Sequence, residues 1–490
     1  MTNYAIRHRA ILRKIARRAM IERGLLPDYS PAVLAELESI HAIPTGVEDS
    51  VRDLRHLLWC SIDNDDSRDL DQLTAAESMA TGAAIIYVAI ADVDSFVKRD
   101  TAIDNHARHN TTSIYTAAEI FPMLPEKLSA DLTSLNYNAE RLSVVVEMGI
   151  ETDGSLHYSG VYRARVLNHA KLAYNSIAAW LDSNGEMPER VAAVEGLAEN
   201  LRIQDKVAQT MKMFRHVHGA LTLETIETRP VFEEDILTGL DTEKKNRAKD
   251  IIENFMIAAN GVTARYLNSK LFPSLRRVVH IPKRWDRIVE IAAEAGFMLP
   301  AAPDPGALEQ FLVKQKNAEP LGFPDLSLSI IKLLGPGQYI AESPGGTVEG
   351  HFGLAVKDYS HSTAPNRRYP DLITQRLLKA AIAGNSVPYD KNELTWLAQH
   401  CTEEEDAVKK VERRVEKSAA AMLVESRIGQ QFDGIVTGAA SKGTWVRLFH
   451  PPIEGRLIQG FEGVDVGHRI RVQLVHTDVE KGFIDFRRVR

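Results

Sequence analysis

The sequence predicts an α+β fold in which a sheet comes first and helices follow, with a smaller module at each end. Apolar runs of strand length, rich in Val, Ile and Tyr, recur between residues 56 and 167. From residue 241 the apolar residues recur every three or four positions, and after residue 431 they alternate with polar ones. Because strands have a period of two and helices a period of 3.6, these changes divide the chain into parts.

The first 50 residues form a predicted helical module. Residues 4–23 carry apolar side chains near the helical period before Gly24, and Ser30 with Pro31 suits the N-cap and first position of a second helix. Such a pair is similar to a helix-turn-helix module that binds nucleic acid. Two other interpretations stay open. One is a helical extension packed on the central part, and the other is an organellar presequence, against which the second capped helix argues.

The same segment is basic although the whole chain is acidic. The 490 residues carry a net charge of −7, yet residues 1–26 hold seven basic residues against Glu22 alone, which gives 7 − 1 = +6. A nucleic-acid partner normally requires a basic surface, so this segment is a candidate contact. The basic residues are Arg7, Arg9, Arg13, Lys14, Arg17, Arg18 and Arg23.

Cysteine use and hydropathy limit the class of protein. Cys60 and Cys401 are the two cysteines, and their wide separation gives neither a disulfide framework nor a zinc pattern. This fits a reducing cytoplasm. No run of about 18 apolar residues occurs, so no membrane span is expected.

The central part is predicted to contain strands followed by helices. Expected strands cover residues 56–62, 84–91, 142–150, 156–167 and 221–231. Asp241 is predicted to cap a helix that runs to about residue 268. Further helices are expected over residues 284–295, 305–316, 369–383 and 392–427, with a loop over residues 335–346.

Residues 431–490 return to alternation in short segments separated by glycine-containing turns. This pattern is similar to the S-one type OB-fold, which binds single strands through a basic groove and exposed aromatic rings. Trp445, Phe449 and Phe461 are the candidate rings. The alternative for each ring is a place in the barrel core, which we expect for about half of them.

An acidic run follows the first predicted strand. Five carboxylates fall within nine positions, namely Asp63, Asp65, Asp66, Asp69 and Asp71. Such crowding is costly unless cations neutralise it, and Mg²⁺ favours carboxylates, waters and substrate phosphate oxygens. The spacing argues against a helix-loop-helix calcium site, because no Gly stands at the sixth position and no Glu at the twelfth. The alternative is a solvated acidic loop.

Three stretches together resemble the ribonuclease II and ribonuclease R family. They are the acidic run within residues 62–73, Tyr115 with residues 122–129, and residues 364–373, which read Ala-Pro-Asn-Arg-Arg-Tyr-Pro-Asp-Leu-Ile. The resemblance implies an RNB-type catalytic domain over residues 51–430 and an RNA-binding OB-fold over residues 431–490. It implies a Mg²⁺-dependent exoribonuclease, with Mn²⁺ as a possible substitute, that degrades RNA from the 3′ end to nucleoside 5′-monophosphates.

The N-terminus departs from this family. Its better-known members carry tandem cold-shock-like β-barrels before the catalytic domain, whereas about 50 residues precede it here. That length is too short for one OB barrel and a linker, and the pattern is helical. How RNA reaches the site is therefore left open by the resemblance.

The resemblance also implies roles for particular residues. Asp63, Asp69 and Asp71 take the places of three aspartates that hold the catalytic metals, and the fourth place falls on Gln72. A Gln offers a carbonyl oxygen but no charge. Affinity for a second ion is therefore expected to fall unless Asp65 or Asp66 compensates.

Three further residues match family positions at the substrate, and Arg368 beside one of them is also a candidate contact. Arg367 corresponds to the arginine on the scissile phosphate, and Tyr115 to the aromatic that stacks on the 3′-terminal base. Arg368 is a second candidate with a structural role as its alternative, and Glu412 is expected near the terminal nucleotide. Without the resemblance, Tyr115 would be predicted as a core residue.

We therefore expect a cytoplasmic, processive 3′-to-5′ exoribonuclease. The expected partner is single-stranded RNA with a free 3′ end; no membrane and no small-molecule cofactor are expected, and we expect a monomer. The rival hypothesis is a non-catalytic RNA-binding paralogue, for which Gln72 is the reason.

Overall fold

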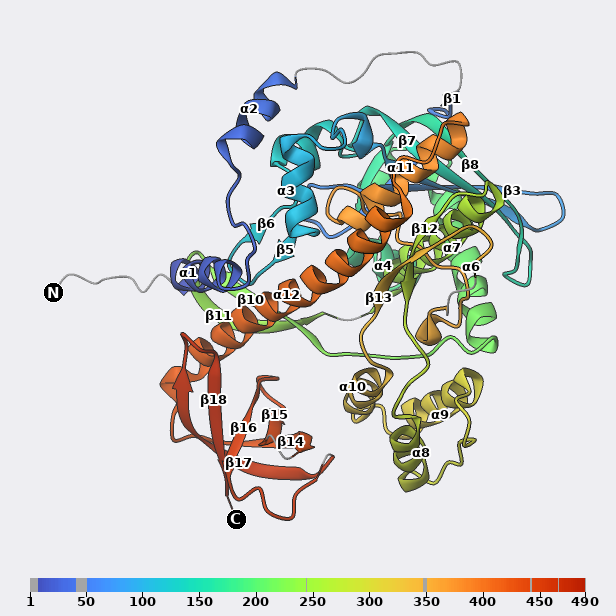
Figure 1. Cartoon of the computed structure of the whole chain (residues 1–490). Coiled ribbons are helices and arrows are strands. Elements are labelled where there is room, and N and C mark those ends of the chain that lie inside the picture. Colours follow the sequence, from blue (N-terminus) through green and yellow to red (C-terminus); the bar gives the residue numbers. More distant parts are fainter. Residues whose placement is uncertain are drawn as a thin grey trace.

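A seven-stranded sheet forms the centre of the computed structural model (Figure 1), which describes residues 8–40, 51–243, 245–346, 350–440, 443–465 and 467–489. The strand order is β1-β8-β7-β4-β3-β2-β9, with β1–β8 and β2–β9 parallel and the other pairs antiparallel. The strands are β1 Arg52–Asp53, β2 Cys60–Asp63, β3 Gln72–Ser78, β4 Ala84–Ala91, β7 Glu140–Ile150, β8 Leu156–Leu167 and β9 Ala170–Ala173. The α+β prediction is confirmed.

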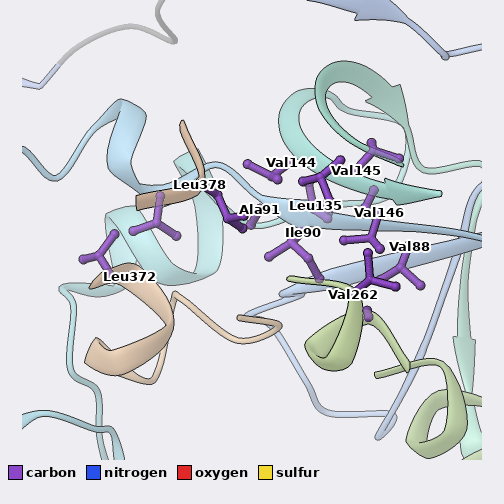
Figure 2. Close-up of a cluster of buried hydrophobic side chains, with 14 of the residues drawn as sticks. Val88, Ile90, Ala91, Leu135, Val144, Val145, Val146, Val262, Leu372 and Leu378 are labelled. Atoms are coloured by element: carbon purple, nitrogen blue, oxygen red, sulfur yellow. The ribbon is translucent and has the colours of Figure 1, made fainter. Parts of the chain in front are cut away.

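Helices pack on this sheet and bury it. The long helices are α6 Leu197–Val217, α7 Arg247–Ser269 and α11 Tyr369–Ala383. Figure 2 shows Val88 and Ile90 of β4 beside Val262 of α7, while Leu372 and Leu378 of α11 lie near Ala91. Strand β4 reads as an unbroken apolar run because seven of its eight residues are buried.

Short elements complete the body around the sheet. They are α3 Ala102–Asn110, the ribbon β5 Ile114–Tyr115 and β6 Ile120–Phe121, a π-helix Lys127–Leu132, α4 Tyr174–Leu181 and α5 Glu189–Ala192. Short 3₁₀ turns cover Val93–Ser95, Phe352–Leu354 and Glu425–Arg427.

A small helical lobe extends from the body. It consists of α8 Trp285–Glu294, α9 Pro305–Ala318 and α10 Phe323–Leu334, which share a separate apolar core. The strands β12 Ser274–Val278 and β13 Gln338–Glu342 lead into and out of the lobe and pair with each other. Residues 335–346 are thus not a simple loop, because cross-strand pairing outweighs the glycines and proline at the start of that segment.

The region before α7 corrects two predictions. Asp241 does not cap a helix but lies in β11 Ile236–Glu243, which pairs with β10 Glu227–Glu233 as a hairpin. The N-cap of α7 is Asn246, whose Oδ1 accepts a hydrogen bond from the Lys249 N–H at 3.0 Å. The strand predicted from residue 221 begins at Glu227. An isolated Asp before an apolar run is compatible with a helix N-cap and with a strand of a hairpin. Here the pairing of β11 with β10 determines that Asp241 lies in a strand.

The two N-terminal helices are α1 His8–Ile21 and α2 Pro31–Ser39. Ser30 caps α2 through its Oγ, which accepts from the Val33 N–H at 3.3 Å. Helix α1 packs on the long helix α12 Lys391–Val424 and on β11, with a buried face made by Leu12, Ile15, Ala16, Ala19 and Met20 (Figure 1). The predicted helical residues 4–7 lie outside the described residues.

Four arginines of α1 form ion pairs with acids of other segments. Arg9 lies 3.9 Å from Asp235 and Arg13 lies 3.2 Å from Glu119. Arg17 pairs with Asp28 and Arg18 with Glu480. These contacts fit the interpretation of α1 as an extension packed on the rest of the chain.

The C-terminal residues form a closed barrel in the order β14-β15-β16-β18-β17. Its strands are β14 Gln431–Ala440, β15 Gly443–Leu448, β16 Glu454–Gln459, β17 Arg469–Asp478 and β18 Phe483–Arg488, which agrees with the predicted OB-fold. Phe449 and Phe461 are exposed and Trp445 is half-buried, so none of the three is a core residue.

Helix α12 joins the body, α1 and the barrel. Ala420, Ala421 and Val424 at its end pack in the barrel core. At the β17–β18 turn, a Cβ on Gly482 would lie 2.8 Å from Lys417 Cβ, so glycine permits this close approach. In the part of the chain that the structure describes, no helix has the length and apolar character needed to cross a bilayer.

Candidate active site

The acidic run lies in the loop between β2 and β3. Asp63 ends β2, and Asp71 comes directly before β3, whose pairing with β2 brings the loop ends together. The Oδ1 of Asp63 accepts hydrogen bonds from the Asn64 N–H at 2.7 Å and from Ser67 Oγ at 3.0 Å. Lys171 donates to the carbonyl oxygen of Ser67 at 2.6 Å. The loop is therefore held in a fixed shape from both sides.

Asp71 is buried and joined to the segment that leads into α11. Its Oδ1 accepts from the Asn366 N–H and its Oδ2 from Arg367 Nε, each at 3.0 Å. Burial raises the pKa of Asp71 to about 7; the Arg367 charge opposes this rise and the Asp69 charge adds to it. Two stretches that are almost 300 residues apart in sequence thus meet at one carboxylate.

Asp69 and Tyr115 face each other beside the acidic loop, and both line one cavity. The Tyr115 hydroxyl donates to Asp69 Oδ2 at 3.4 Å, and Tyr115 is 42% exposed. Tyr115 is thus not a core residue. Burial raises the pKa of Asp69, with a smaller rise from the neighbouring Asp63 charge and an opposing effect of Arg367. Carboxylates that repel one another persist where a cation or a positively charged group compensates.

Glu412 on α12 supports Tyr115. Its Oε1 accepts from the Tyr115 N–H at 2.9 Å, which ties α12 to β5. Burial raises the pKa of the Glu412 carboxyl.

The two neighbouring arginines differ in surroundings. The Arg367 side chain is 41% exposed, which leaves part of the guanidinium accessible beside its bond to Asp71. Arg368 lies 2.7 Å from the fully buried Asp371, which also accepts from the Ala364 N–H. Arg368 therefore holds the start of α11 as well as lining the site.

Gln72, Asp65 and Asp66 are less closely joined to the site. Gln72 is the first residue of β3, is half-buried and pairs with Ile90; no side-chain hydrogen bond of Gln72 occurs among the described residues. Asp65 and Asp66 are exposed. Their part in metal binding stays a prediction.

Two cavities meet at Tyr115 and Glu412. The first has a volume of about 210 Å³ and is bounded by Arg367, Arg368 and residues of α12 and β13. The second has a volume of about 540 Å³ and is bounded by Asp66, Asp69 and Arg229, among others. Tyr115 thus separates a small compartment from a larger one.

The donor atoms fit a hard divalent cation that substrate helps to bind. Among the described residues, no three His, Cys, Asp or Glu side chains are already arranged around one point. Mg²⁺ seldom needs such a cage, since one or two carboxylates, waters and substrate phosphates complete its shell. Burial, which raises the pKa values of Asp69 and Asp71, makes their charged forms costly, and a bound cation would offset that cost.

Sequence reasoning missed the residues that position these groups. Lys171 donates to the carbonyl oxygens of Asp65 and Ser67 in the loop, and no spacing pattern marks it. Asn366 lies within the motif of residues 364–373, but its backbone bond to Asp71 was not predicted.

The chain matches two family descriptions: the RNB domain over residues 51–384 and the RNase II-type exonuclease C-terminal S1 domain over residues 430–489. It is 31% identical to ribonuclease R of Aquifex aeolicus, over 90% of this chain and 62% of that protein. Identity to ribonuclease R of Escherichia coli K12 is 30%, over 82% and 50%. The chain thus spans about half the length of most of these curated relatives.

The fold is similar to that of Mycoplasma genitalium RNase R in complex with ribose methylated single-stranded RNA. The TM-score is 0.86 at 22% identity, over 97% of this chain and 77% of that one.

Proposed function

This chain belongs to the RNB-domain family of ribonuclease II and ribonuclease R type proteins, and from that membership we propose that it is a Mg²⁺-dependent 3′-to-5′ exoribonuclease. The substrate would be single-stranded RNA and the products nucleoside 5′-monophosphates. One observation carries the proposal: Asp71 bonds Arg367 while Asp69 bonds Tyr115, so acidic, cationic and aromatic groups meet where the two cavities adjoin at Tyr115.

The arrangement can hold and polarise a phosphodiester. The accessible part of Arg367 is suited to charge that grows on the non-bridging oxygens, since a guanidinium forms strong hydrogen bonds to phosphate. Asp71 fixes the orientation of this guanidinium through Nε. A bound phosphate would thus meet Arg367 on one side and the acidic loop on the other.

Asp63, Asp69 and Asp71 are the residues that would hold Mg²⁺, with Gln72 as a neutral candidate. When bound there, Mg²⁺ would activate water and stabilise the leaving oxygen. The burial that raises the pKa of Asp71 makes its charged form costly without a cation.

Removal of single nucleotides fits the unequal cavities at Tyr115. A ring that is 42% exposed offers a face for any base, and such stacking is tolerant of sequence. The small cavity has room for the terminal group of the RNA, while the larger cavity has room for the nucleotides that precede it. This supports cleavage next to a 3′ end. We further propose a cytoplasmic monomer that acts processively.

A labelled-RNA assay tests the proposal. An oligoadenylate labelled at its 3′ end should release labelled mononucleotide at once in Mg²⁺. The same RNA labelled at its 5′ end should be converted to a short end product with few intermediates. A circular oligoadenylate should stay intact. Binding of linear RNA with no hydrolysis in Mg²⁺ or Mn²⁺ would favour the rival, an RNA-binding paralogue.

Tyr115→Ala tests the role of the ring. If Tyr115 stacks the terminal base, the final 5′-labelled product should lengthen by a nucleotide or more with a modest loss of rate. Tyr115→Phe is the matched control, because it keeps the ring and removes only the bond to Asp69. Identical product lengths in all three proteins would contradict this role.

A further inference from the structure

A third cavity of about 500 Å³ adjoins the active site and has different chemistry. Its wall contains three cationic side chains, Arg229, Lys245 and Lys249, against one carboxylate, Asp241. Three amides, from Asn64, Asn175 and Asn246, complete most of the polar lining. Among the described residues that bound this cavity, none is aromatic.

This lining differs from that of the space around Tyr115. Lysine, arginine and asparagine side chains are typical contacts to phosphate and sugar, whereas base recognition in single strands relies on aromatic rings. A surplus of cations without a ring therefore fits the backbone of a nucleic acid better than its bases. Arg229 and Lys245 are exposed, so the cavity opens to the surface.

The three cavities form a continuous series. The third shares Asn64 and Arg229 with the second, and the second shares Tyr115 and Glu412 with the first. A chain whose terminal base meets Tyr115 and whose next nucleotides occupy the second cavity is directed along Asn64 and Arg229 into the third.

The cationic side chains of the third cavity are held by defined structure. Arg229 lies on β10 opposite Asp241 of β11, while Lys249 lies in the first turn of α7. Asn246 caps α7 with its Oδ1 and donates from Nδ2 to Asn175 Oδ1 at 3.2 Å, which joins α7 to α4. Lys245 donates to the Leu223 carbonyl oxygen at 3.3 Å.

We propose that the third cavity is a subsite for the sugar-phosphate backbone of RNA upstream of the scissile bond, with Arg229, Lys245 and Lys249 as its phosphate contacts. The proposal rests on the proposed function for the direction of the RNA, but the binding itself needs no hydrolysis.

Helix α1 takes an indirect part in this subsite. The β10–β11 hairpin that carries Arg229 is held at its tip, where the Arg9 N–H donates to the Asp235 carbonyl oxygen at 3.2 Å. The Leu237 N–H donates to His8 Nδ1 at 3.1 Å, and the Arg9 guanidinium lies 4.5 Å from the centre of the Phe232 ring. The basic N-terminal helix thus positions a phosphate contact through the hairpin.

The test compares long and short RNA. In the triple variant Arg229→Gln, Lys245→Gln, Lys249→Gln, KM for an oligouridylate of about 20 nucleotides should rise about tenfold, while KM for one of about 4 should stay within about twofold. The rate constant kcat should change little for either. Lys245→Gln alone should show a smaller rise, and Lys391→Gln, a neutralised exposed lysine at the start of α12, should show none.

Binding without hydrolysis separates this proposal from the proposed function. With EDTA present, the affinity of the long RNA should depend less on salt in the triple variant, because three phosphate contacts contribute about 0.7 each to the logarithmic slope. If wild type binds in this way but hydrolyses nothing, the proposed function fails and the subsite stands.

Three results would overturn the subsite. One is an unchanged slope and KM for long RNA. Another is an equal rise in KM for both lengths, which would indicate damage to the active site. The third is weaker inhibition by uridine 5′-monophosphate with unchanged KM for long RNA, which would assign the cavity to the released nucleotide.

Discussion

The acidic loop between β2 and β3 and the basic helix α1 are both dense in charge, but the structure treats them in opposite ways. The arginines of α1 each meet a carboxylate from elsewhere, such as Asp235 or Glu119. The loop carboxylates have fewer cationic partners, and burial raises the pKa of both Asp69 and Asp71. The ion pairs of α1 join segments together, whereas several clustered carboxylates that share one arginine mark a place where a cationic ligand is expected.

The apolar side of α1 also indicates that this helix is a packed structural element. Five buried residues of α1 share a core with Val408, Val411 and Val415 of α12. The basic residues of α1 therefore lie on the outer side of a packed helix, and its arginines are paired with carboxylates. Four measurements test how the loop and α1 differ.

The largest effect is expected at Asp71. Asp71→Asn should lower the rate of RNA hydrolysis by about 10³-fold or more, because it removes a proposed metal ligand and the charge that orients Arg367. RNA affinity should be kept. The matched control is Asp65→Asn in the same loop, whose exposed side chain predicts near-normal turnover. Near-normal turnover of Asp71→Asn would remove the loop from the chemistry.

The second measurement concerns the stability that α1 provides. Leu12 is fully buried, so Leu12→Ala should lower the free energy of unfolding by about 2–5 kcal/mol in a denaturant titration. Arg17→Gln removes a partly exposed ion pair and should cost less than about 1 kcal/mol. The salt dependence of RNA binding should be equal in Arg17→Gln and wild type. A shallower slope in Arg17→Gln would instead show that α1 contacts phosphate directly.

The third measurement is the pH dependence of stability in EDTA. Folding raises the pKa of Asp71 from its ordinary value to about 7, so its contribution to stability is full at acid pH. That contribution is lost as the pH rises from about 4 to about 7, by at most about 1.4 kcal/mol per pH unit. The Tm of wild type should therefore fall relative to that of Asp71→Asn over this range. Parallel curves for the two proteins would contradict the raised pKa.

The smallest effect is expected at Gln72. If Gln72 faces the metals, Gln72→Asp should lower the Mg²⁺ concentration for half-maximal activity several-fold. If Asp65 or Asp66 already supplies the charge, Gln72→Asp should leave that concentration unchanged or raise it, and Asp65→Asn or Asp66→Asn should raise it. A Mg²⁺ titration of all three variants decides. No shift in any of them would place position 72 away from the metals.

Local signals predicted some elements closely. The apolar run of β4 and the period of α11 gave the observed bounds, and Ser30 with Pro31 marked the start of α2. These elements depend on a few neighbouring residues, so contacts with distant parts of the chain do not change them.

Other elements depended on partners that the sequence does not display. Strand β13 exists because it pairs with β12, and Asp241 lies in a strand because β10 lies beside it. Helix α10 was not predicted, although Phe323, Leu326 and Ile330 have helical spacing; its buried apolar residues pack mainly in the core of the small lobe.

The candidate site also contains residues that motifs predict and residues that only the fold brings together. The acidic run and the arginine pair follow from motifs, and the structure brings Asp69, Asp71, Tyr115, Arg367 and Glu412 together. The third cavity does not follow from any motif, because Arg229, Lys245 and Lys249 each look like ordinary surface charges. Only the hairpin and the start of α7 bring them to one wall.

Helix α12 is a stiff connection between the active-site region and the barrel. Its 34 residues span about 51 Å at the usual rise per residue, with Glu412 bonded to the Tyr115 backbone and Lys417 pressed against the β17–β18 turn only five positions later. A backbone hydrogen-bonded helix hardly stretches along its axis. If RNA binds the barrel and its last base stacks on Tyr115, as proposed, tension on the RNA would reach β5 as a displacement. The hold on the RNA chain and the hold on its last base would then be mechanically linked.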